Sequence, residues 1–383
     1  MKHIKLLFLS LIVATSLFAQ EPSHEFRATW LATVSSIDWP KTKATTAEKR
    51  EQQKQELIDI LDKLAAGNMN ACCMQVRSLC DAMYQSSYEP WSAALTGTRG
   101  QDPGYDPLAF AIEEAHKRGI ELHVWVNPFR VTSSGTLSTS DKLQQHAGEW
   151  IIKYDNGSFK GQIIDPGYPA SRAYVIKVLM EIVNNYDVDG ILMDDYFYPY
   201  GGTTTEDSKS KSLHKPSSGI VDQDGDGSTD DDWRRQNVDK TMQALYNRIQ
   251  ATKPWVRFGI SPFGIHRNQK DHESGSATNG LSNYDELFAD VPAWGEKGLI
   301  DYIVPQLYWK IGHSAADYEV LIHWWNDGHF TPHLYIGQNI AVMDEPDTKN
   351  PKETQLKKKI QLSRELDGVA GNVWWPGWSL TNN

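Results

Sequence analysis

The chain has 383 residues, a formal net charge of −11 at pH 7 and 23% charged residues. An acidic balance without a long basic run argues against a nucleic-acid partner, because proteins that bind nucleic acid cluster Lys and Arg against the phosphates. The one extended apolar stretch lies near the N-terminus and is too short for a stable membrane-spanning helix.

The first 20 residues predict a secretory signal peptide. Lys2 and Lys5 precede an apolar segment at 6–17, and Ala19 ends a small-residue motif of the kind that signal peptidases cleave. No cysteine lies near this position, which argues against a lipoprotein anchor. We therefore expect an exported protein, in the periplasm or outside the cell, that has no stable membrane insertion after cleavage. Residues 21–383 are expected to form a single domain.

Strand and helix patterns alternate along residues 21–383. Buried strands are predicted from short apolar runs bounded by turn residues, and helices from apolar residues at helical spacing with capping residues at the ends. In chain order, the expected strands are 26–34, 69–76, 120–126, 188–193, 256–260, 301–307, 334–337 and 369–375. The expected helices are 46–66, 107–118, 170–186, 232–252, 284–297, 315–325 and 352–366.

Long polar loops follow several of these strands, notably at 77–105, 131–142 and 201–232. Loops of that length in a compact domain are usually functional. The alternation predicts an α/β fold of the (β/α)8 TIM-barrel type with long loops after its strands. An open doubly wound sheet is the rival, but no Gly-rich phosphate motif follows the first strand. Only eight residues follow the last expected strand, so the barrel is expected to close with a shortened element, unless the last assignments are wrong.

Two adjacent carboxylates end the fourth expected strand. The segment 188–200 reads Val-Asp-Gly-Ile-Leu-Met-Asp-Asp-Tyr-Phe-Tyr-Pro-Tyr. Burying an unpaired carboxylate costs several kcal/mol or more, so Asp194 and Asp195 should lie at the mouth of the sheet rather than in its core. Catalytic residues of barrel enzymes collect at that mouth. The alternative is a pair of aspartates that cap the next loop.

Aromatic and cysteine content favour some chemistries over others. Fourteen tryptophans and sixteen tyrosines suit a cleft that stacks rings on sugars, although core packing explains most of them individually. Cys72, Cys73 and Cys80 are interpreted as small buried residues rather than ligands or nucleophiles. No His-Cys cluster with zinc spacing is present.

Several motifs resemble the glycosyl-hydrolase-like 10 family, formerly a domain of unknown function. Residues 26–40, Phe-Arg-Ala-Thr-Trp-Leu-Ala-Thr-Val-Ser-Ser-Ile-Asp-Trp-Pro, resemble its opening motif. Later blocks that resemble the family are 103–108, 114–119, 125–130, 165–167, 188–198, 232–237, 259–264 and 305–309. The resemblance implies an exported barrel hydrolase of β-linked amino-sugar polymers, since a characterised member acts on peptidoglycan glycan strands that lack stem peptides. The chain departs from the family at its end, where the usual final helix is not evident.

Glycoside hydrolysis needs a proton donor and a second group opposite it. We expect Asp194 to face the cleft and to be catalytic, with Asp195 as its partner or orienting group. Adjacent strand residues point to opposite faces, so both can reach one site only if the strand ends between them. Asp81 in the loop 77–105 is either a facing carboxylate or a loop cap.

Further residues after strand ends are candidates for binding sugar. These are Asn127, Arg130, Tyr196, Tyr198, Ser261, His266, Arg267 and Gln306, with Tyr308 for an acetamido group and Trp309 and Trp374 as stacking platforms. For each polar group a loop hydrogen bond is the alternative. Arg130 and Arg267 match the geometry of a lactyl carboxylate on muramic acid. Compared with family 18 chitinases, Tyr196 stands where their acid glutamate would be, so substrate-assisted catalysis is a hypothesis only.

A separate acidic motif raises the question of calcium. Asp222, Asp224 and Asp226 alternate before Gly227, as in the first half of a calcium loop, but the twelfth position is Trp233 rather than Glu. A structural calcium or a solvated acidic loop are both consistent with this pattern, and no cofactor is required for the expected chemistry. The sequence favours a hydrolase of peptidoglycan or a related amino-sugar polymer. A hydrolase of a neutral polysaccharide and a non-catalytic carbohydrate-binding barrel are the alternatives.

Overall fold

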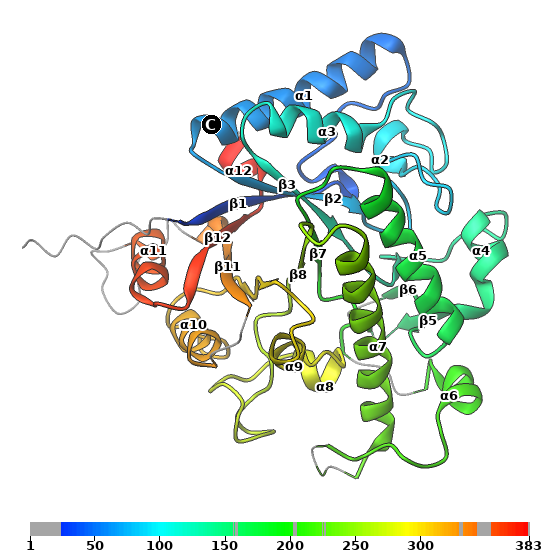
Figure 1. The fold of residues 1–383 in the computed structure, drawn as a ribbon, viewed down its shortest axis with the longest axis vertical. Helices are drawn as coiled ribbons and strands as arrows, with labels where there is room; N and C mark the ends of the chain where they lie inside the picture. The colour runs from blue at the N-terminus through cyan, green and yellow to red at the C-terminus, as the bar shows by residue number, and fades with distance from the viewer. Residues whose placement is uncertain are drawn as a thin grey trace, which may run out of the picture.

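The computed structural model describes residues 24–155, 157, 160–201, 205–223, 225, 227–328, 332–342 and 354–381. Its main sheet is wholly parallel and runs in the order β10-β11-β12-β1-β2-β3-β7-β8-β9, with β9 also paired to β11. That last pairing closes the sheet into a barrel (Figure 1). Because β9 and β10 are two halves of one passage of the chain, the barrel has eight passages, and the predicted (β/α)8 fold is confirmed.

Each expected strand is present. The barrel strands are β1 Phe26–Leu31, β2 Ala71–Arg77, β3 Glu121–Val126, β7 Gly190–Met193, β8 Arg257–Ile260, β9 Tyr302–Ile303, β10 Gln306–Leu307, β11 His333–Asn339 and β12 Val369–Trp375. The sixth passage is split at Pro305, which has no N–H to give to the ladder.

Helices surround the barrel where amphipathic patterns predict them. The longer ones are α1 Ala47–Ala66, α3 Pro107–His116, α5 Pro169–Asn185, α7 Thr229–Thr252, α10 Tyr318–Asp327 and α11 Gln355–Glu365. The short ones are α2 Ala93–Thr96, α4 Lys142–Ala147, α6 Ser208–His214, α8 Asn283–Glu286, α9 Val291–Glu296 and α12 Trp378–Thr381, with 3₁₀ turns at η1 Val34–Ser36, η2 Gly148–Trp150 and η3 Ile340–Val342. Within the described ranges, each helix is too short or too polar to cross a bilayer.

One local expectation was wrong. The single helix expected at 284–297 is two short helices, α8 and α9, because Phe288 adopts a left-handed backbone (φ 54°) between them. Residues 133–141 form the expected loop, but this loop belongs to an excursion with an unpredicted three-stranded antiparallel sheet in the order β4-β6-β5. Its strands are β4 Arg130–Thr132, β5 Ile151–Asp155 and β6 Lys160–Ile164, which are too short to carry a readable alternation.

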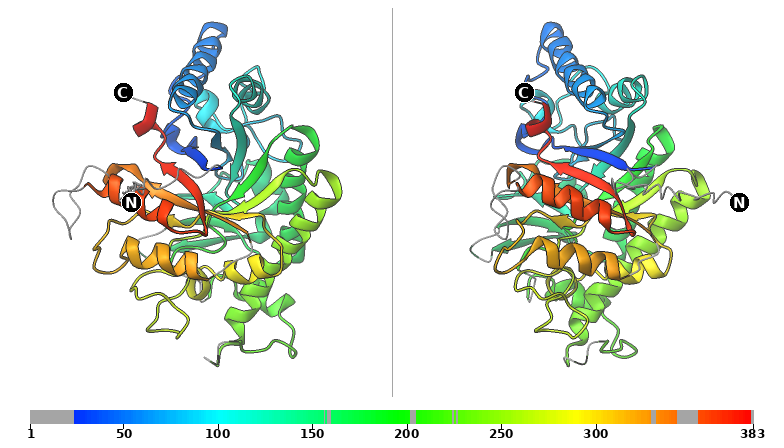
Figure 2. Two further views of the ribbon diagram at one scale, coloured as in Figure 1. Left: turned by 60° about the vertical axis from the view of Figure 1, so that its left-hand side comes forward. Right: turned by 90° about the vertical axis from the view of Figure 1, so that its left-hand side faces the viewer.

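The first and last strands lie side by side, as the views from two sides show (Figure 2). Asp38, just after η1, fastens this seam. Its carboxylate accepts from the backbone N–H of Ala32 at 2.6 Å and from that of Trp378 at 2.8 Å. Lys63 of α1 also donates to the carbonyl of Thr381. The short α12 therefore takes the place of a full closing helix. This is the alternative in which the barrel closes with a shortened final element.

Side chains alternate between the barrel interior and the outer core. Ala28 and Trp30 of β1, Cys73 of β2, Trp125 of β3 and Leu192 of β7 share the interior cluster. The intervening residues pack outward against the helices. Cys72, Cys73 and Cys80 are free and buried, as predicted.

Candidate active site

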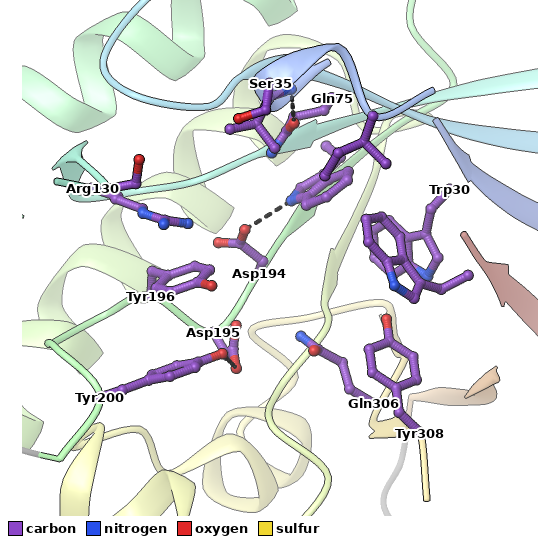
Figure 3. A pocket seen from close by; sticks show the side chains of 15 residues that line it. Trp30, Ser35, Gln75, Arg130, Asp194, Asp195, Tyr196, Tyr200, Gln306 and Tyr308 are labelled. Carbon is purple, nitrogen blue, oxygen red and sulfur yellow. Dashed lines mark hydrogen bonds between the residues drawn. The ribbon is translucent and has the colours of Figure 1, made fainter. Parts of the chain in front are cut away.

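A pocket of about 380 Å³ opens at the carboxyl ends of the barrel strands (Figure 3). Its lining residues are Trp30, Val34, Ser35, Ile37, Gln75, Trp125, Arg130, Ser133, Asp194, Asp195, Tyr196, Tyr200, Gln306, Tyr308 and Trp375. Six of the predicted site residues are among them: Asp194, Asp195, Arg130, Tyr196, Gln306 and Tyr308. The pocket combines two carboxylates with aromatic walls, as a sugar site requires.

Asp194 reaches the pocket because of strand parity. Gly190 and Leu192 of β7 face the barrel interior, so the next residue of the same face is Asp194. Its Oδ2 accepts a hydrogen bond of 2.9 Å from the indole N–H of Trp125, while its Oδ1 has no hydrogen-bond partner among the described residues. One carboxylate oxygen is thus fixed, and the other is left for a ligand.

Asp195 also lines the pocket, because β7 ends at Met193 and the backbone turns after it. Its Oδ2 accepts a hydrogen bond of 2.6 Å from the hydroxyl of Tyr200. A hydrogen bond from Gln306 also favours its charged form. The strand thus ends one residue earlier than the expected end between the two aspartates, and both carboxylates line one pocket.

The two carboxylates differ in their surroundings. Burial and the neighbouring charge of Asp195 raise the pKa of Asp194, and the Trp125 hydrogen bond and the Arg130 charge oppose the rise only in part. Burial also raises the pKa of Asp195, but the hydrogen bonds from Tyr200 and Gln306 offset more of that rise. The pair can therefore hold one proton near neutral pH, preferentially on Asp194.

Arg130 provides the cation of the pocket. Its guanidinium carbon lies 4.4 Å from the centre of the Tyr196 ring, and Tyr196 in turn stacks on Tyr200 with ring centres 4.9 Å apart. Arg130 Nε is buried and has no hydrogen-bond partner among the described residues. The stack holds the guanidinium beside the two aspartates in position to meet an anionic group.

Three tryptophans and a tyrosine form the opposite wall. The rings of Trp30 and Trp125 meet edge-on at 4.9 Å, and those of Trp125 and Trp375 at 6.0 Å. Within the described chain, the buried indole N–H of Trp30 has no acceptor. Burial and the nearby negative charges of Asp195 and Asp194 raise the pKa of Tyr308, so its hydroxyl stays protonated as a donor.

A strained turn completes the pocket. Ser35 and Ser36 both adopt left-handed backbone conformations, with φ of 52° and 53°, which cost energy for residues other than glycine. Gln75 holds the turn, because its side-chain oxygen accepts from the backbone N–H groups of Thr33 at 3.1 Å and Val34 at 2.9 Å. The turn thus places Ser35 in the wall.

Sequence reasoning missed Trp30, Gln75, Trp125, Tyr200 and Trp375. Four of them occupy inward positions of β1, β2, β3 and β12, and counting alternate residues along those strands would have found them. The prediction of Trp374 as the platform was wrong by one residue. Trp375 lines the pocket, whereas Trp374 lies on the other face of the strand.

The structure corrects the catalytic prediction for Asp81. Its Oδ1 accepts from the backbone N–H groups of Ser78 at 3.3 Å and Leu79 at 2.9 Å, and its Oδ2 lies 3.9 Å from Arg99. It does not line the pocket. Asp81 is the loop cap that the sequence left as its alternative.

Three further residues that were predicted to bind sugar instead form hydrogen bonds to the backbone or pack in the core. Asn127 accepts from the backbone N–H of Arg130 at 3.1 Å, and Ser261 donates to the carbonyl of Val304 at 2.8 Å. Tyr198 is fully buried against Phe288, with ring centres 5.0 Å apart. These polar groups follow strand ends because loops begin there and need capping.

The remaining candidates lie away from the pocket. Arg267 pairs with Asp285 at 2.7 Å, and the ring of His266 stacks on Trp324 at 5.5 Å. Trp309 packs edge-on against Phe263, with ring centres 5.4 Å apart. They do not line this pocket, and their role in binding sugar stays a prediction.

The calcium prediction stays open. Asp224 and Asp226 lie outside the described residues. The carboxylate of Asp222 accepts from the backbone N–H groups of Gly225 at 2.8 Å and Gly227 at 2.9 Å, as a loop cap does.

Residues 25–355 match the family described as glycosyl hydrolase-like 10. The chain belongs to this family. Glycosyl hydrolase YngK of Bacillus subtilis is 40% identical over 400 residues, which cover 100% of this chain and 75% of the relative. Glycosyl hydrolase DigH of Escherichia coli K12 is 36% identical over 375 residues, which cover 92% of this chain and 83% of the relative. Family membership and these relatives identify the chain as a glycoside hydrolase.

Solved structures share the fold. The glycoside hydrolase domain of PgaB (BpsB) from Bordetella bronchiseptica has a TM-score of 0.56 at 10% identity, covering 93% of this chain and 94% of that chain. Alpha-L-fucosidase isoenzyme 2 from Paenibacillus thiaminolyticus has a TM-score of 0.54 at 14% identity, covering 91% of this chain and 46% of that chain. At such low identity the likeness extends to the barrel alone.

Proposed function

We propose that the protein hydrolyses glycosidic bonds in peptidoglycan glycan strands or a related amino-sugar polymer, with Asp194 as the general acid. The observation that carries the proposal is the unequal pair at the pocket: Asp194 is held by Trp125 and has a free Oδ1, while Asp195 is stabilised in its charged form by Tyr200. Such a pair separates the acid from the anion that glycoside hydrolysis requires.

In the first step, protonated Asp194 donates its proton to the oxygen of the leaving sugar as the bond from that oxygen to C1 breaks. Trp125 fixes the carboxyl by its Oδ2, so the proton is delivered from Oδ1, the oxygen that is buried and has no hydrogen-bond partner among the described residues. In the second step, water attacks C1 and breaks the bond between C1 and the group that displaced the leaving sugar, and charged Asp194 accepts a proton from this water, which restores the starting state.

The second role falls to Asp195 or to the substrate. Among the described residues that line the pocket, the carboxylates are Asp194 and Asp195 alone. In a substrate-assisted reaction the acetamido oxygen attacks C1, Asp195 accepts a hydrogen bond from the acetamido N–H, and the Tyr308 hydroxyl supports the oxygen. In a direct reaction Asp195 attacks C1 itself. Substrates without a 2-acetamido group distinguish the two, because only the direct route cleaves them as fast.

Arg130 supports the choice of peptidoglycan. Muramic acid carries a lactyl carboxylate, and the guanidinium of Arg130 lies beside the catalytic pair with its Nε free of any partner among the described residues. A neutral polysaccharide offers hydroxyl groups but no carboxylate with which this cation could form an ion pair.

The test is digestion of peptide-free peptidoglycan strands and of neutral glycans by the wild type and by Asp194→Asn, with product analysis by mass spectrometry. We expect cleavage of the amino-sugar strands and a fall in kcat of about 10²–10⁴-fold in the variant, the range for loss of a general acid. Preferential cleavage of neutral glycans would favour the alternative that the protein is a hydrolase of a neutral polysaccharide. Absence of turnover on every glycan, or unchanged turnover by Asp194→Asn, would contradict the proposal.

Export is a further part of this proposal. It rests on the pattern of residues 1–20, which lie outside the described residues. N-terminal sequencing of the protein recovered from periplasmic or culture fractions tests it, with cleavage near Ala19 or Gln20 expected.

A further inference from the structure

A second cavity, of about 780 Å³, lies beside the active-site pocket, and we call it the side cavity. One wall comes from the long loop that follows β2, and the other from the excursion that follows β3. The loop 77–105 stands out in the sequence by its length, yet the catalytic pocket uses none of its residues. The side cavity is where this loop presents its side chains.

The lining of the side cavity matches a neutral, hydroxyl-rich ligand. Trp91 is half-buried, with part of its ring against the hydrophobic core and part at the cavity. Hydroxyl groups from Thr98, Thr136, Ser138 and Ser140 lie around it. One aromatic face surrounded by hydroxyls is a combination that binds the apolar face and the edge groups of a pyranose.

Three of the charged side chains that line the side cavity are held in ion pairs, and Asp102 and Lys142 line it as well. Arg99 bonds to Asp141 at 2.7 Å, and Glu89 is held by the buried guanidinium of Arg77 at 2.6 Å. Among the described residues of the lining, the cations are Arg99 and Lys142, and Arg99 is paired, so the cavity offers no cluster of cations for a phosphate or a nucleic acid. Its chemistry therefore fits sugar units better than anions.

The side cavity and the pocket share one wall. Ser133 lines the pocket and Thr136 lines the side cavity, so their Cα atoms lie at most about 11 Å apart, the span of three extended residues. Arg99 also donates to the carbonyl of Cys80 at 2.8 Å, and the Cys80 thiol donates to the carbonyl of Arg130 at 3.4 Å. A single polymer can thus occupy both, and the wall between them is fastened.

We propose that the side cavity is a remote subsite that binds sugar units of the same glycan strand whose scissile bond lies at Asp194. The inference rests on the proposed function and adds that the enzyme favours long strands over short oligosaccharides. Binding energy from remote units raises the affinity for a polymer without touching the reacting centre.

The experiment fills the side cavity. Thr136 is exposed and makes no hydrogen bond that the backbone needs, so Thr136→Trp should occlude the cavity without unfolding the loop. Thr139→Trp is the matched control, because Thr139 is exposed on the same segment and lines neither cavity. The ratio of kcat/KM for peptide-free strands to kcat/KM for a tetrasaccharide from the same strands is measured for wild type and both variants. The ratio should fall about tenfold in Thr136→Trp, equivalent to about 1.4 kcal/mol, and stay unchanged in Thr139→Trp.

A binding measurement separates this inference from the proposed function. Each tryptophan substitution is combined with Asp194→Asn, and the affinities for strands and tetrasaccharide are measured by calorimetry. Chain-length-dependent affinity that Thr136→Trp removes supports the remote subsite even if wild-type turnover is absent, in which case only the proposed function fails. Equal affinity for long and short chains, or an equal effect of the two tryptophans, overturns the remote subsite.

Discussion

Asp194 and Asp195 are neighbours in the chain, yet they differ in what touches them. Asp194 accepts a side-chain hydrogen bond of 2.9 Å from Trp125 and has an oxygen without a partner among the described residues, whereas Asp195 accepts one of 2.6 Å from the hydroxyl of Tyr200. Burial raises the pKa of both carboxyls, and the charge of Asp195 raises that of Asp194 further, while Asp195 is the one of the two with a hydroxyl donor that favours its charged form. The division of roles therefore depends on the donors around each carboxylate rather than on burial.

Tyr200→Phe should change the pH dependence of the enzyme. The variant loses the 2.6 Å hydrogen bond that stabilises the Asp195 carboxylate, so the pKa of Asp195 should rise further. Because the reaction needs Asp195 charged, the acidic limb of the kcat/KM profile should move to higher pH, with activity lost first at low pH. Profiles measured from pH 4 to 9 would show it. Tyr246→Phe, at a half-buried tyrosine outside the pocket, is the control, and a limb that stays in place would exclude this role for Tyr200.

At the scale of elements, the seam between β1 and β12 depends on a few polar contacts. Asp38 joins the turn after β1 to the start of α12 through two backbone N–H groups, and both acceptor oxygens belong to one buried carboxylate. Trp375, which lines the pocket, lies just before α12. The last helix is thus tied to the site as well as to the fold.

Asp38→Ala should loosen this seam. Two backbone N–H groups would lose their acceptor, the buried one of Ala32 and the part-buried one of Trp378, at a cost of about 1–3 kcal/mol for a group that stays buried and unsatisfied. We expect Tm to fall by several degrees and proteolysis near Trp378 to become faster, as followed by calorimetry and limited trypsin or chymotrypsin digestion. Asp59→Ala, at an exposed position of α1, provides the comparison. Equal melting of the two variants would show that Asp38 does not hold the seam.

The sequence predicted the eight barrel strands and the position of Asp194, because apolar runs and alternate-residue parity are local properties. It did not predict β4, β5 and β6, whose short strands are stable only through pairing with one another. Asn127 and Ser261 were misassigned for a related reason. A polar residue at a strand end looks the same in sequence whether it caps a loop or faces a ligand, and only the folded chain distinguishes the two.

At the scale of the whole molecule, the barrel interior is filled by layers of different character. Below the pocket, the His123 ring bonds to the Tyr302 hydroxyl at 2.7 Å, and Phe26 stacks on Tyr335 at 4.2 Å. Glycine on neighbouring strands makes room for these rings: a Cβ on Gly259 would lie 2.3 Å from atoms of the Tyr302 ring. The interior is a packed core that supports the pocket from beneath.

Gly259→Ala should therefore destabilise the entire barrel. The added methyl group must displace the Tyr302 ring within a filled layer, and overpacking of this kind typically costs about 1–3 kcal/mol. The free energy of unfolding in urea should fall by that amount while the transition stays cooperative. Gly67→Ala serves as the reference, since its Cβ would meet nothing closer than 3.4 Å. A variant as stable as the wild type would mean that this layer has unoccupied space.

The barrel and the excursion between β3 and α5 are two parts of this architecture that can change independently. Among the described residues, the strands of the excursion pair with one another, and Arg130 and Ser133 are its contribution to the lining of the pocket that holds Asp194 and Asp195. Insertions, deletions and exchanges there can accumulate while β7 keeps its register. Related enzymes that share the same catalytic residues can in this way differ in substrate preference, because the excursion changes while the barrel does not.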